Sequence, residues 1–129
     1  MAKLFLGLDS STQSLSAVLI DLGARKVIYE KSLNFDQALP HYKTRNGVLP
    51  NRDPLVKHSP PLMWAEALDL LFAAMKKDGV PLGEILAVSG CGQQHGSVYL
   101  NSKAEAALAN LNPKKSLEEN LDGVFARKT

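Results

Sequence analysis

The sequence predicts an α/β fold in which helices pack on a mixed β-sheet. Two observations carry this prediction. The chain opens with three strand-like runs joined by short turns, and a helix of regular apolar spacing then leads into a fourth strand-like run. Strands joined by tight turns pair in antiparallel fashion, whereas a strand that follows a helix can pair in parallel with an earlier one. The order β-β-β-α-β therefore predicts a mixed sheet.

The first three strands are apolar runs bounded by turn-forming residues. We expect them at residues 3–9 ("KLFLGLD"), 15–21 ("LSAVLID") and 26–35 ("KVIYEKSLNF"). The connecting stretches "DSSTQS" and "LGAR" contain Gly, Ser and Asp, which favour tight turns. An antiparallel meander at the N-terminus follows from this spacing.

A helix is expected after the proline-rich, loop-like stretch of residues 36–61. Ser59 is the predicted N-cap, Lys76 and Lys77 lie in the last turn near the negative end of the helix dipole, and Gly79 ends the helix. One apolar stripe is predicted, formed by Trp64, Leu68, Leu71 and Met75.

The fourth strand, "EILAVSG" (residues 84–90), is apolar enough to be buried, and "SVYL" (residues 97–100) is a further strand-like run. Residues 103–111 have the composition of a helix with a weak apolar face. The polar tail that follows has four apolar anchors, Leu117, Leu121, Val124 and Phe125. We therefore expect a core of sheet and helix over about residues 1–101 and a helical, polar tail over 102–129.

Bulk composition excludes several classes of protein. The chain has 129 residues, enough for one domain with its own core, and its net charge of +2 gives no basic stripe for nucleic acid. A single cysteine, Cys91, excludes an internal disulfide and favours a reducing compartment. No apolar run approaches the roughly 20 residues of a membrane span, and the opening residues, which lead straight into a strand pattern, predict no signal peptide. We expect a cytoplasmic protein that binds neither nucleic acid nor membrane.

The stretch "DSSTQS" (residues 9–14) has the chemistry of an anion site. Backbone N–H groups and hydroxyls in a tight turn form a concavity in which Ser11, Thr12 and Gln13 could hold phosphate oxygens. Asp9 could hold Mg²⁺ directly or through water. The alternative is a turn whose polar side chains bond only to their own backbone. P-loop and dinucleotide-binding glycine motifs are both absent.

The stretch "GCGQQHG" (residues 90–96) follows the fourth strand. Its glycines allow sharp turns, and Gln93, Gln94 and His95 present both donors and acceptors, which suits a ligand with several hydroxyls. The alternative is a glycine-rich connection whose amides satisfy buried backbone groups. No Ser-His-Asp arrangement and no metal-spaced cluster is visible.

The element order, with Asp9 at the tip of the first strand, is that of the opening of the ribonuclease-H-like fold of actin-like ATPases. In such a sheet the ends of strands one and four lie close together. "DSSTQS" and "GCGQQHG" are then expected beside one cleft. A nuclease of this fold needs several carboxylates around two metals, and strand four ends in Ser89 and Gly90 without an acid.

The segments "LGLDSSTQS", "SPPLMWAEALDLL" and "VSGCGQQHGSVYL" resemble the N-terminal part of the FGGY carbohydrate kinases, most closely the xylulose kinase branch. The resemblance covers about residues 4–125, and "GQQHG" is its most specific piece. It implies that residues 1–129 are the N-terminal part of the first domain of such a kinase. It also implies an ATP-dependent enzyme that phosphorylates D-xylulose to D-xylulose 5-phosphate.

Carried over by residue, the resemblance implies that Asp9 and the turn Ser11, Thr12 and Gln13 face the ATP phosphates and Mg²⁺. Gln94 and His95 would bind hydroxyls of the ketopentose. Two positions depart from the family: Ser11 stands where glycine is common, and Ser16 stands where many members have Lys or Arg. Losing that cation weakens the expected hold on phosphate.

The resemblance places the general base beyond Thr129, so we expect no catalytic residue in this chain and no activity from it alone. An unpaired sheet edge should favour a homo-oligomer or self-association of the fragment. Two alternatives stay open. One is an FGGY kinase for another sugar or polyol, such as ribulose or gluconate, and the other is a non-catalytic actin-like nucleotide-binding module.

Overall fold

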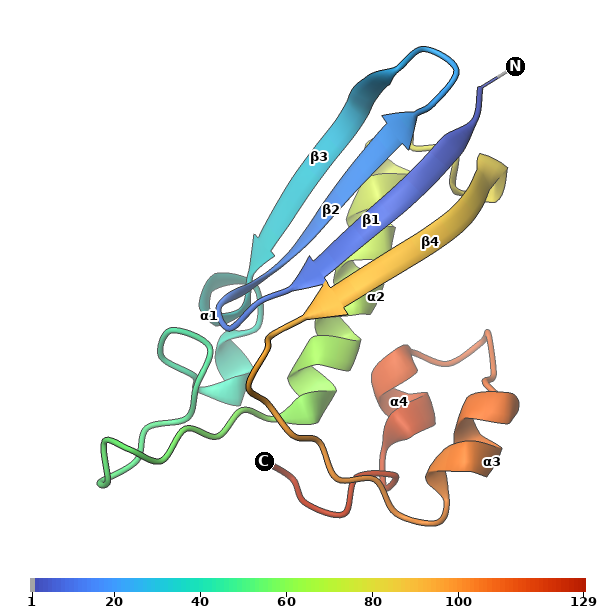
Figure 1. Cartoon of the computed structure of the whole chain (residues 1–129). Coiled ribbons are helices and arrows are strands. Elements are labelled where there is room, and N and C mark those ends of the chain that lie inside the picture. The colour runs from blue at the N-terminus through green and yellow to red at the C-terminus, as the bar shows by residue number, and fades with distance from the viewer. Residues whose placement is uncertain (1) are drawn as a thin grey trace.

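A four-stranded mixed sheet forms the body of the molecule in a computed structural model, which describes residues 2–129 (Figure 1). The strands are β1 (Leu4–Ser10), β2 (Ser14–Asp21), β3 (Lys26–Asn34) and β4 (Ile85–Gly92), in the spatial order β3-β2-β1-β4. β1 pairs with β2 and β2 with β3 in antiparallel fashion, and β4 pairs with β1 in parallel. The predicted meander and the parallel fourth strand are both confirmed.

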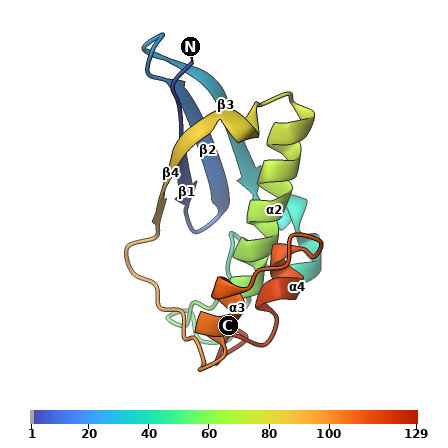
Figure 2. The same cartoon turned by 90° about the vertical axis from the view of Figure 1, so that its right-hand side faces the viewer.

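Helix α2 (Pro61–Lys77) covers one face of the sheet and packs on β2 and β3 (Figure 2). Leu71 and Met75 are fully buried as predicted, while Trp64 and Leu68 are only partly buried at the margin of the core. The core is completed by apolar side chains of the strands, of the helix and of the segment between them: Leu4, Leu6, Leu15, Ala17, Leu19, Phe35, Leu39, Met63 and Ala67. The apolar face of α2 is wider than the predicted stripe because α4 packs on the helix as well.

The two ends of α2 differ from each other in how well they were predicted. The predicted N-cap, Ser59, is wrong: Pro60 holds that position without a side-chain cap, and the Ser59 hydroxyl donates instead to the carbonyl of Gly47, at 2.7 Å. The predicted C-terminus is confirmed, since Lys76 and Lys77 lie in the last turn and Gly79 follows with a φ of +84°.

Strand β4 is not the buried strand that its apolar sequence predicts. Leu86 is 64% exposed and Val88 is 55% exposed, although Val88 lies opposite Leu6 of β1, which is only 2% exposed. The reason is position: β4 is an edge strand, and α2 packs toward the opposite half of the sheet.

The stretch predicted as a loop contains short ordered elements. Helix α1 (Phe35–Ala38) directly follows β3, and a 3₁₀ turn η1 (Pro40–Tyr42) follows α1. A tight turn at Asn46 and Gly47 is closed by the paired residues Arg45 and Val48. A second 3₁₀ turn, η2 (Leu82–Glu84), leads into β4.

The tail folds back under the sheet (Figure 1). It forms helices α3 (Ala104–Ala109), within the range predicted as helical, and α4 (Leu117–Leu121), whose start has a capping box between Ser116 and Glu119. The run "SVYL" does not form a strand. Only Leu100 of that run pairs with the tail, as an isolated bridge to Phe125, because the chain has left the sheet there.

The predicted apolar anchors of the tail hold it in place. Val124 is buried, and the other three anchors are half-buried. None of the helices described over residues 2–129 has both the length and the apolar character needed to cross a membrane.

Candidate functional site

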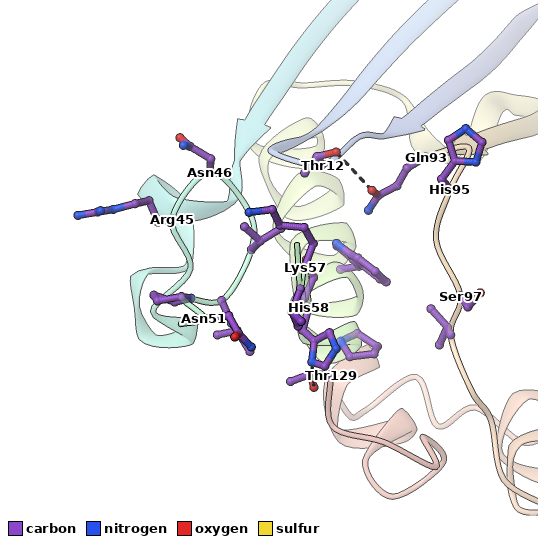
Figure 3. Close-up of a pocket in the computed structure, with 18 of the residues that line it drawn as sticks. Thr12, Arg45, Asn46, Asn51, Lys57, His58, Gln93, His95, Ser97 and Thr129 are labelled. Atoms are coloured by element: carbon purple, nitrogen blue, oxygen red, sulfur yellow. Dashed lines mark hydrogen bonds between the residues drawn. The ribbon is translucent and has the colours of Figure 1, made fainter. Parts of the chain in front are cut away.

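Parallel pairing of β1 and β4 brings the two polar stretches together. Asp9 lies opposite Cys91 and Ser10 opposite Gly92, so the chain leaves both strands at the same edge of the sheet. The Thr12 hydroxyl donates to the side-chain carbonyl of Gln93, at 3.3 Å (Figure 3). The prediction that the two stretches lie side by side is confirmed. We call residues 11–13 the β1–β2 turn and residues 93–99 the post-β4 segment.

A cleft of about 1000 Å³ opens beside this contact. The β1–β2 turn contributes Thr12 and Gln13 to its lining, and the post-β4 segment contributes Gln93 and His95. Residues 45–59 and the end of the tail form the other walls, and Figure 3 shows Lys57 and His58 across from His95. The two predicted polar stretches therefore share one cleft.

The charged side chains of Lys, Arg, Asp and Glu type that line the cleft are all cationic. Its lining includes Arg45, Lys57 and Arg127, and no Asp or Glu of the described residues is part of it. Arg45 points away from the centre of the cleft in Figure 3, and the Arg127 guanidinium lies 5.0 Å from the centre of the Tyr99 ring. Cationic side chains without acidic side chains beside them favour an anionic ligand group.

Within the β1–β2 turn, the polar groups divide into two sets. The Ser11 backbone N–H donates to the carbonyl of Ser14 at 2.9 Å, and the Ser11 hydroxyl contacts the same carbonyl at 3.1 Å. Ser11 is thus used by the turn itself. Thr12 and Gln13 are exposed and line the cleft, whereas Ser11 and Asp9 do not. The phosphate-binding roles predicted for all four stay predictions.

Asp9 lies at the exposed end of β1, beside the Cys91 thiol. A hydrogen bond with Asp9 raises the pKa of the Cys91 thiol, with a further contribution from partial desolvation. The thiol also donates to the Leu8 carbonyl, at 3.6 Å. Because the thiol is held in its protonated form, Cys91 is a poor nucleophile.

No three side chains of His, Cys, Asp or Glu within residues 2–129 are grouped so that they could hold a metal ion. Asp9 alone fits one kind of metal, since Mg²⁺ commonly takes one or two carboxylates and completes its shell with water and phosphate oxygens. The predicted role of Asp9 at Mg²⁺ is compatible with that donor set and stays a prediction.

The post-β4 segment presents its side chains in a different pattern from the one predicted. His95 lines the cleft as expected, but Gln93 does so in place of Gln94. The sequence predicts Gln93 as one of three polar side chains suited to a ligand, but the resemblance implies the sugar-binding role only for Gln94 and His95.

Ser16 stands at the position where the resemblance implies a Lys or Arg side chain. It lies opposite Asp9 in the sheet, and its hydroxyl is 3.0 Å from the hydroxyl of Ser32 on β3. Where the resemblance leads one to expect Lys or Arg, the chain has a neutral pair of hydroxyls. Lys57, on a segment predicted to be loop, supplies a cation to the cleft instead.

Comparison with known proteins adds independent information. No protein-family model matches the chain. It is 44% identical to a xylulose kinase of Mus musculus over 121 residues, and the alignment covers 94% of this chain and 22% of the mouse protein. It is 43% identical over 129 residues to xylulose kinase 2 of Arabidopsis thaliana, covering 98% of this chain and 23% of the relative. The yeast Saccharomyces cerevisiae has a xylulose kinase that is 41% identical over 128 residues, covering 97% and 21%.

The chain therefore spans about a fifth of the length of these curated relatives. Among solved structures, a gluconate kinase from Lactobacillus acidophilus superposes with a TM-score of 0.57 at 21% identity, over 80% of this chain and 18% of that one. At that level of identity the likeness concerns the fold, and it confirms the α/β fold class predicted from the sequence.

Proposed function

Because the chain belongs to the FGGY carbohydrate kinases, we propose that it supplies the N-terminal part of an ATP-dependent kinase that converts D-xylulose to D-xylulose 5-phosphate. One observation carries the proposal. A turn rich in hydroxyls and backbone donors and a segment rich in Gln and His meet on one cleft, joined by the contact of Thr12 with Gln93.

The β1–β2 turn is the phosphate side of the proposed site. Phosphoryl transfer depends on positioning and on neutralising charge more than on covalent chemistry. The Gln13 side-chain amide and the backbone N–H groups of Thr12 and Gln13 are the donors offered to phosphate oxygens, since the Thr12 hydroxyl itself donates to Gln93. Asp9 would hold Mg²⁺, which when bound neutralises the charge of the phosphates.

The post-β4 segment is the sugar side. A ketopentose hydroxyl both gives and accepts hydrogen bonds, and the imidazole of His95 and the amide of Gln93 offer both functions on the cleft wall. Gln94, which lies outside the lining, would act from the margin of the site. Lys57 on the opposite wall suits the negative charge of the phosphoryl group in transfer.

The general base is the part of the chemistry that these residues do not supply. Abstracting a proton from a sugar hydroxyl needs a base within hydrogen-bond reach. The resemblance to the FGGY kinases implies an aspartate in this role, and no Asp or Glu side chain of the described residues lines the cleft. We therefore place the base outside residues 1–129. The chain alone is then one wall of an active site and is inactive by itself.

A second substrate has one observation in its favour. Gluconate carries a carboxylate, and a cleft with Lys57 and Arg127 and without acidic side chains would accept a sugar acid. The relatives at 41–44% identity are named for xylulose, however, and the gluconate kinase is only 21% identical. We therefore rank D-xylulose first.

The experiment is a chimera in which residues 1–129 replace the matching segment of the mouse xylulose kinase. ADP formation is measured with D-xylulose, D-ribulose and D-gluconate. We expect the highest kcat/KM with D-xylulose. A folded chimera that prefers gluconate would replace the substrate, and one that binds ATP but uses no sugar would refute the assignment.

The 129-residue chain itself is the matched control in the same assay. It should form no ADP in a sugar-dependent way, because one wall cannot align two substrates or exclude water from the reaction. Sugar-dependent turnover by this chain would show that the base lies within it.

A further inference from the structure

Two residues of the segment between β3 and α2, Phe35 and Gly47, contact the backbone of the β1–β2 turn. The backbone N–H of Phe35, the first residue of α1, donates to the carbonyl of Gln13, at 2.9 Å. Gly47 packs directly against the peptide of Thr12. Both contacts engage the backbone of the two residues whose side chains face the cleft.

The contact at Gly47 is too close for any side chain. A Cβ atom at this position would lie 1.7 Å from the Thr12 carbonyl oxygen and 2.8 Å from the carbonyl carbon. Gly47 is buried and has a φ of +78°, which most other residues avoid. Asn46 before it has a φ of +54°, so the two residues form the tight turn typical of an Asn-Gly pair.

The Asn46–Gly47 turn is itself fixed by two side chains. The Asp36 carboxylate accepts hydrogen bonds from the backbone N–H of Asn46 at 2.6 Å and of Gly47 at 3.1 Å, and from the Thr44 hydroxyl at 2.7 Å. The Ser59 hydroxyl donates to the Gly47 carbonyl at 2.7 Å. The hydrogen bond from Thr44, together with those from Gly47 and Asn46, lowers the pKa of Asp36, so the carboxylate is ionised at neutral pH.

We propose that the Asn46–Gly47 turn is a positioning element for phosphate binding, with Gly47 as the residue that sets the Thr12 peptide and Asp36 as the residue that sets Gly47. The inference rests on the proposed function, because it concerns the same phosphate side of the cleft. Backbone donors bind phosphate well only when they are already aimed at it, and a displacement of about 1 Å can cost about a hundredfold in rate. Neither Gly47 nor Asp36 needs to touch the ligand for this role.

The test uses the 129-residue chain and magnesium tripolyphosphate as the probe. Backbone amide shifts of Thr12 and Gln13 are followed by NMR during the titration, and a separate titration with D-xylulose follows His95. Gly47→Ala should weaken tripolyphosphate binding at least tenfold and leave the response to D-xylulose unchanged. A merely structural role would lower both affinities together.

Gly79→Ala is the matched control. Gly79 also has a positive φ, of +84°, but nothing lies within 4 Å of the position its Cβ would take. It therefore imposes the same kind of backbone strain without the contact on Thr12, and its tripolyphosphate affinity should equal that of the wild type. Equal affinity of Gly47→Ala and Gly79→Ala would overturn the proposal.

Asp36→Asn keeps the proposal testable if Gly47→Ala does not fold. An amide has one acceptor oxygen where the carboxylate has two, so the turn should loosen and tripolyphosphate binding should weaken about threefold or more. Asp53→Asn is its control, since Asp53 accepts a hydrogen bond from the Leu55 N–H in a local turn away from Thr12. Unchanged binding in Asp36→Asn would overturn the proposal.

Phosphate binding at Thr12 and Gln13 and the positioning role of Gly47 and Asp36 can be refuted separately. If the wild-type amides of Thr12 and Gln13 do not respond to tripolyphosphate, the phosphate assignment fails and this inference fails with it. If they respond in the wild type and equally in Gly47→Ala and Asp36→Asn, only the positioning role fails.

Discussion

The two edges of the sheet are built differently. Edge strand β3 carries three charged side chains, Lys26, Glu30 and Lys31, while the other edge strand, β4, has the sequence "ILAVSGCG" without a charge. β3 is also tied to the end of α2, because Lys31 and Tyr29 both bond to Asp78, at 2.7 and 2.8 Å. Charges on an edge discourage further strand pairing, and β4 has none of that protection.

The segments that follow the strands show the same contrast. The β1–β2 turn is held by Phe35 and Gly47, whereas the post-β4 segment is exposed throughout and contacts the turn through Gln93. The groups proposed to bind phosphate therefore lie on a turn whose backbone is held by neighbouring residues. The groups proposed to bind the sugar lie on the exposed post-β4 segment, which follows an uncharged edge strand that could pair with another strand.

The largest expected effect compares two leucines on neighbouring strands. Leu6→Ala should lower the free energy of unfolding by about 2–5 kcal/mol, because it leaves a cavity in the core. Leu86→Ala should lower it by less than about 1 kcal/mol, since Leu86 is 64% exposed. Urea unfolding followed by circular dichroism measures both. Equal losses would mean that β4 is covered in solution and would end the contrast.

The sequence was sufficient for the order of the elements but not for the burial of β4. Apolar spacing and turn residues specify which segments pair, and the parallel pairing of β4 with β1 followed from the helix between them. Burial depends on what lies over a strand, and the pattern of residues 84–90 is the same whether a helix covers it or not. The β4 sequence is that of a covered strand, which residues 2–129 leave exposed.

The second prediction concerns the phosphate side of the site, in the chimera. Asp9→Asn should lower kcat at least about a hundredfold, which corresponds to about 2.7 kcal/mol of transition-state stabilisation. The reason is the loss of the charge that would hold Mg²⁺ at the transferring phosphate. Steady-state kinetics with Asp53→Asn as the control measures it. Weakened D-xylulose binding with unchanged dependence on Mg²⁺ would contradict the division between the two sides.

The third prediction concerns the sugar side. His95→Ala should weaken D-xylulose binding by about 1–3 kcal/mol, the usual effect of removing a hydrogen-bond partner, and leave ATP affinity nearly unchanged. Calorimetry on the chimera measures both affinities. His41→Ala is the control, because His41 pairs with Glu66 and does not line the cleft. Wild-type sugar affinity in His95→Ala would remove His95 from the site.

The sequence predicted the two polar stretches that meet at the candidate site, but it did not predict the residues that contact the β1–β2 turn. Stretches of polar residues after β1 and β4 could be found because each lies at a strand end. Gly47 packs against the peptide of Thr12, which is far away in the sequence, and Asp36 accepts a hydrogen bond from the Gly47 N–H across 11 residues. No local pattern reports either contact. Only the Asn-Gly pair at residues 46–47 carried a signal, that of a tight turn.

The fourth prediction tests the edge itself. If the uncharged β4 edge drives self-association, Leu86→Lys should weaken it at least tenfold, or by about 1.4 kcal/mol, because a charge on an edge opposes pairing. Ile28→Lys, on the already charged β3 edge, should have little effect. Sedimentation velocity over a range of concentrations measures this. A wild-type chain that stays monomeric throughout would show that β4 does not act as a pairing edge.

The smallest expected effect lies on the β3 edge. Burial first, and then the hydrogen bond to Asp78, raise the pKa of Tyr29 to about 12. Asp78→Asn removes the second cause and keeps the first, so the pKa of Tyr29 should fall but remain above its ordinary value of 10. Ultraviolet titration against a Tyr29→Phe background isolates this group.

The same contacts predict how stability depends on pH. Hydrogen bonds from Lys31 and Tyr29 lower the pKa of Asp78. The stabilisation by the Asp78 carboxylate is therefore present above the unfolded pKa of about 4 and is lost as pH falls through the folded value. The stability difference between wild type and Asp78→Asn should therefore be constant from about pH 5 to 8 and disappear in stronger acid. A difference that persists in acid would mean that Asp78 acts by packing at the end of α2, and that charge does not tie down this edge.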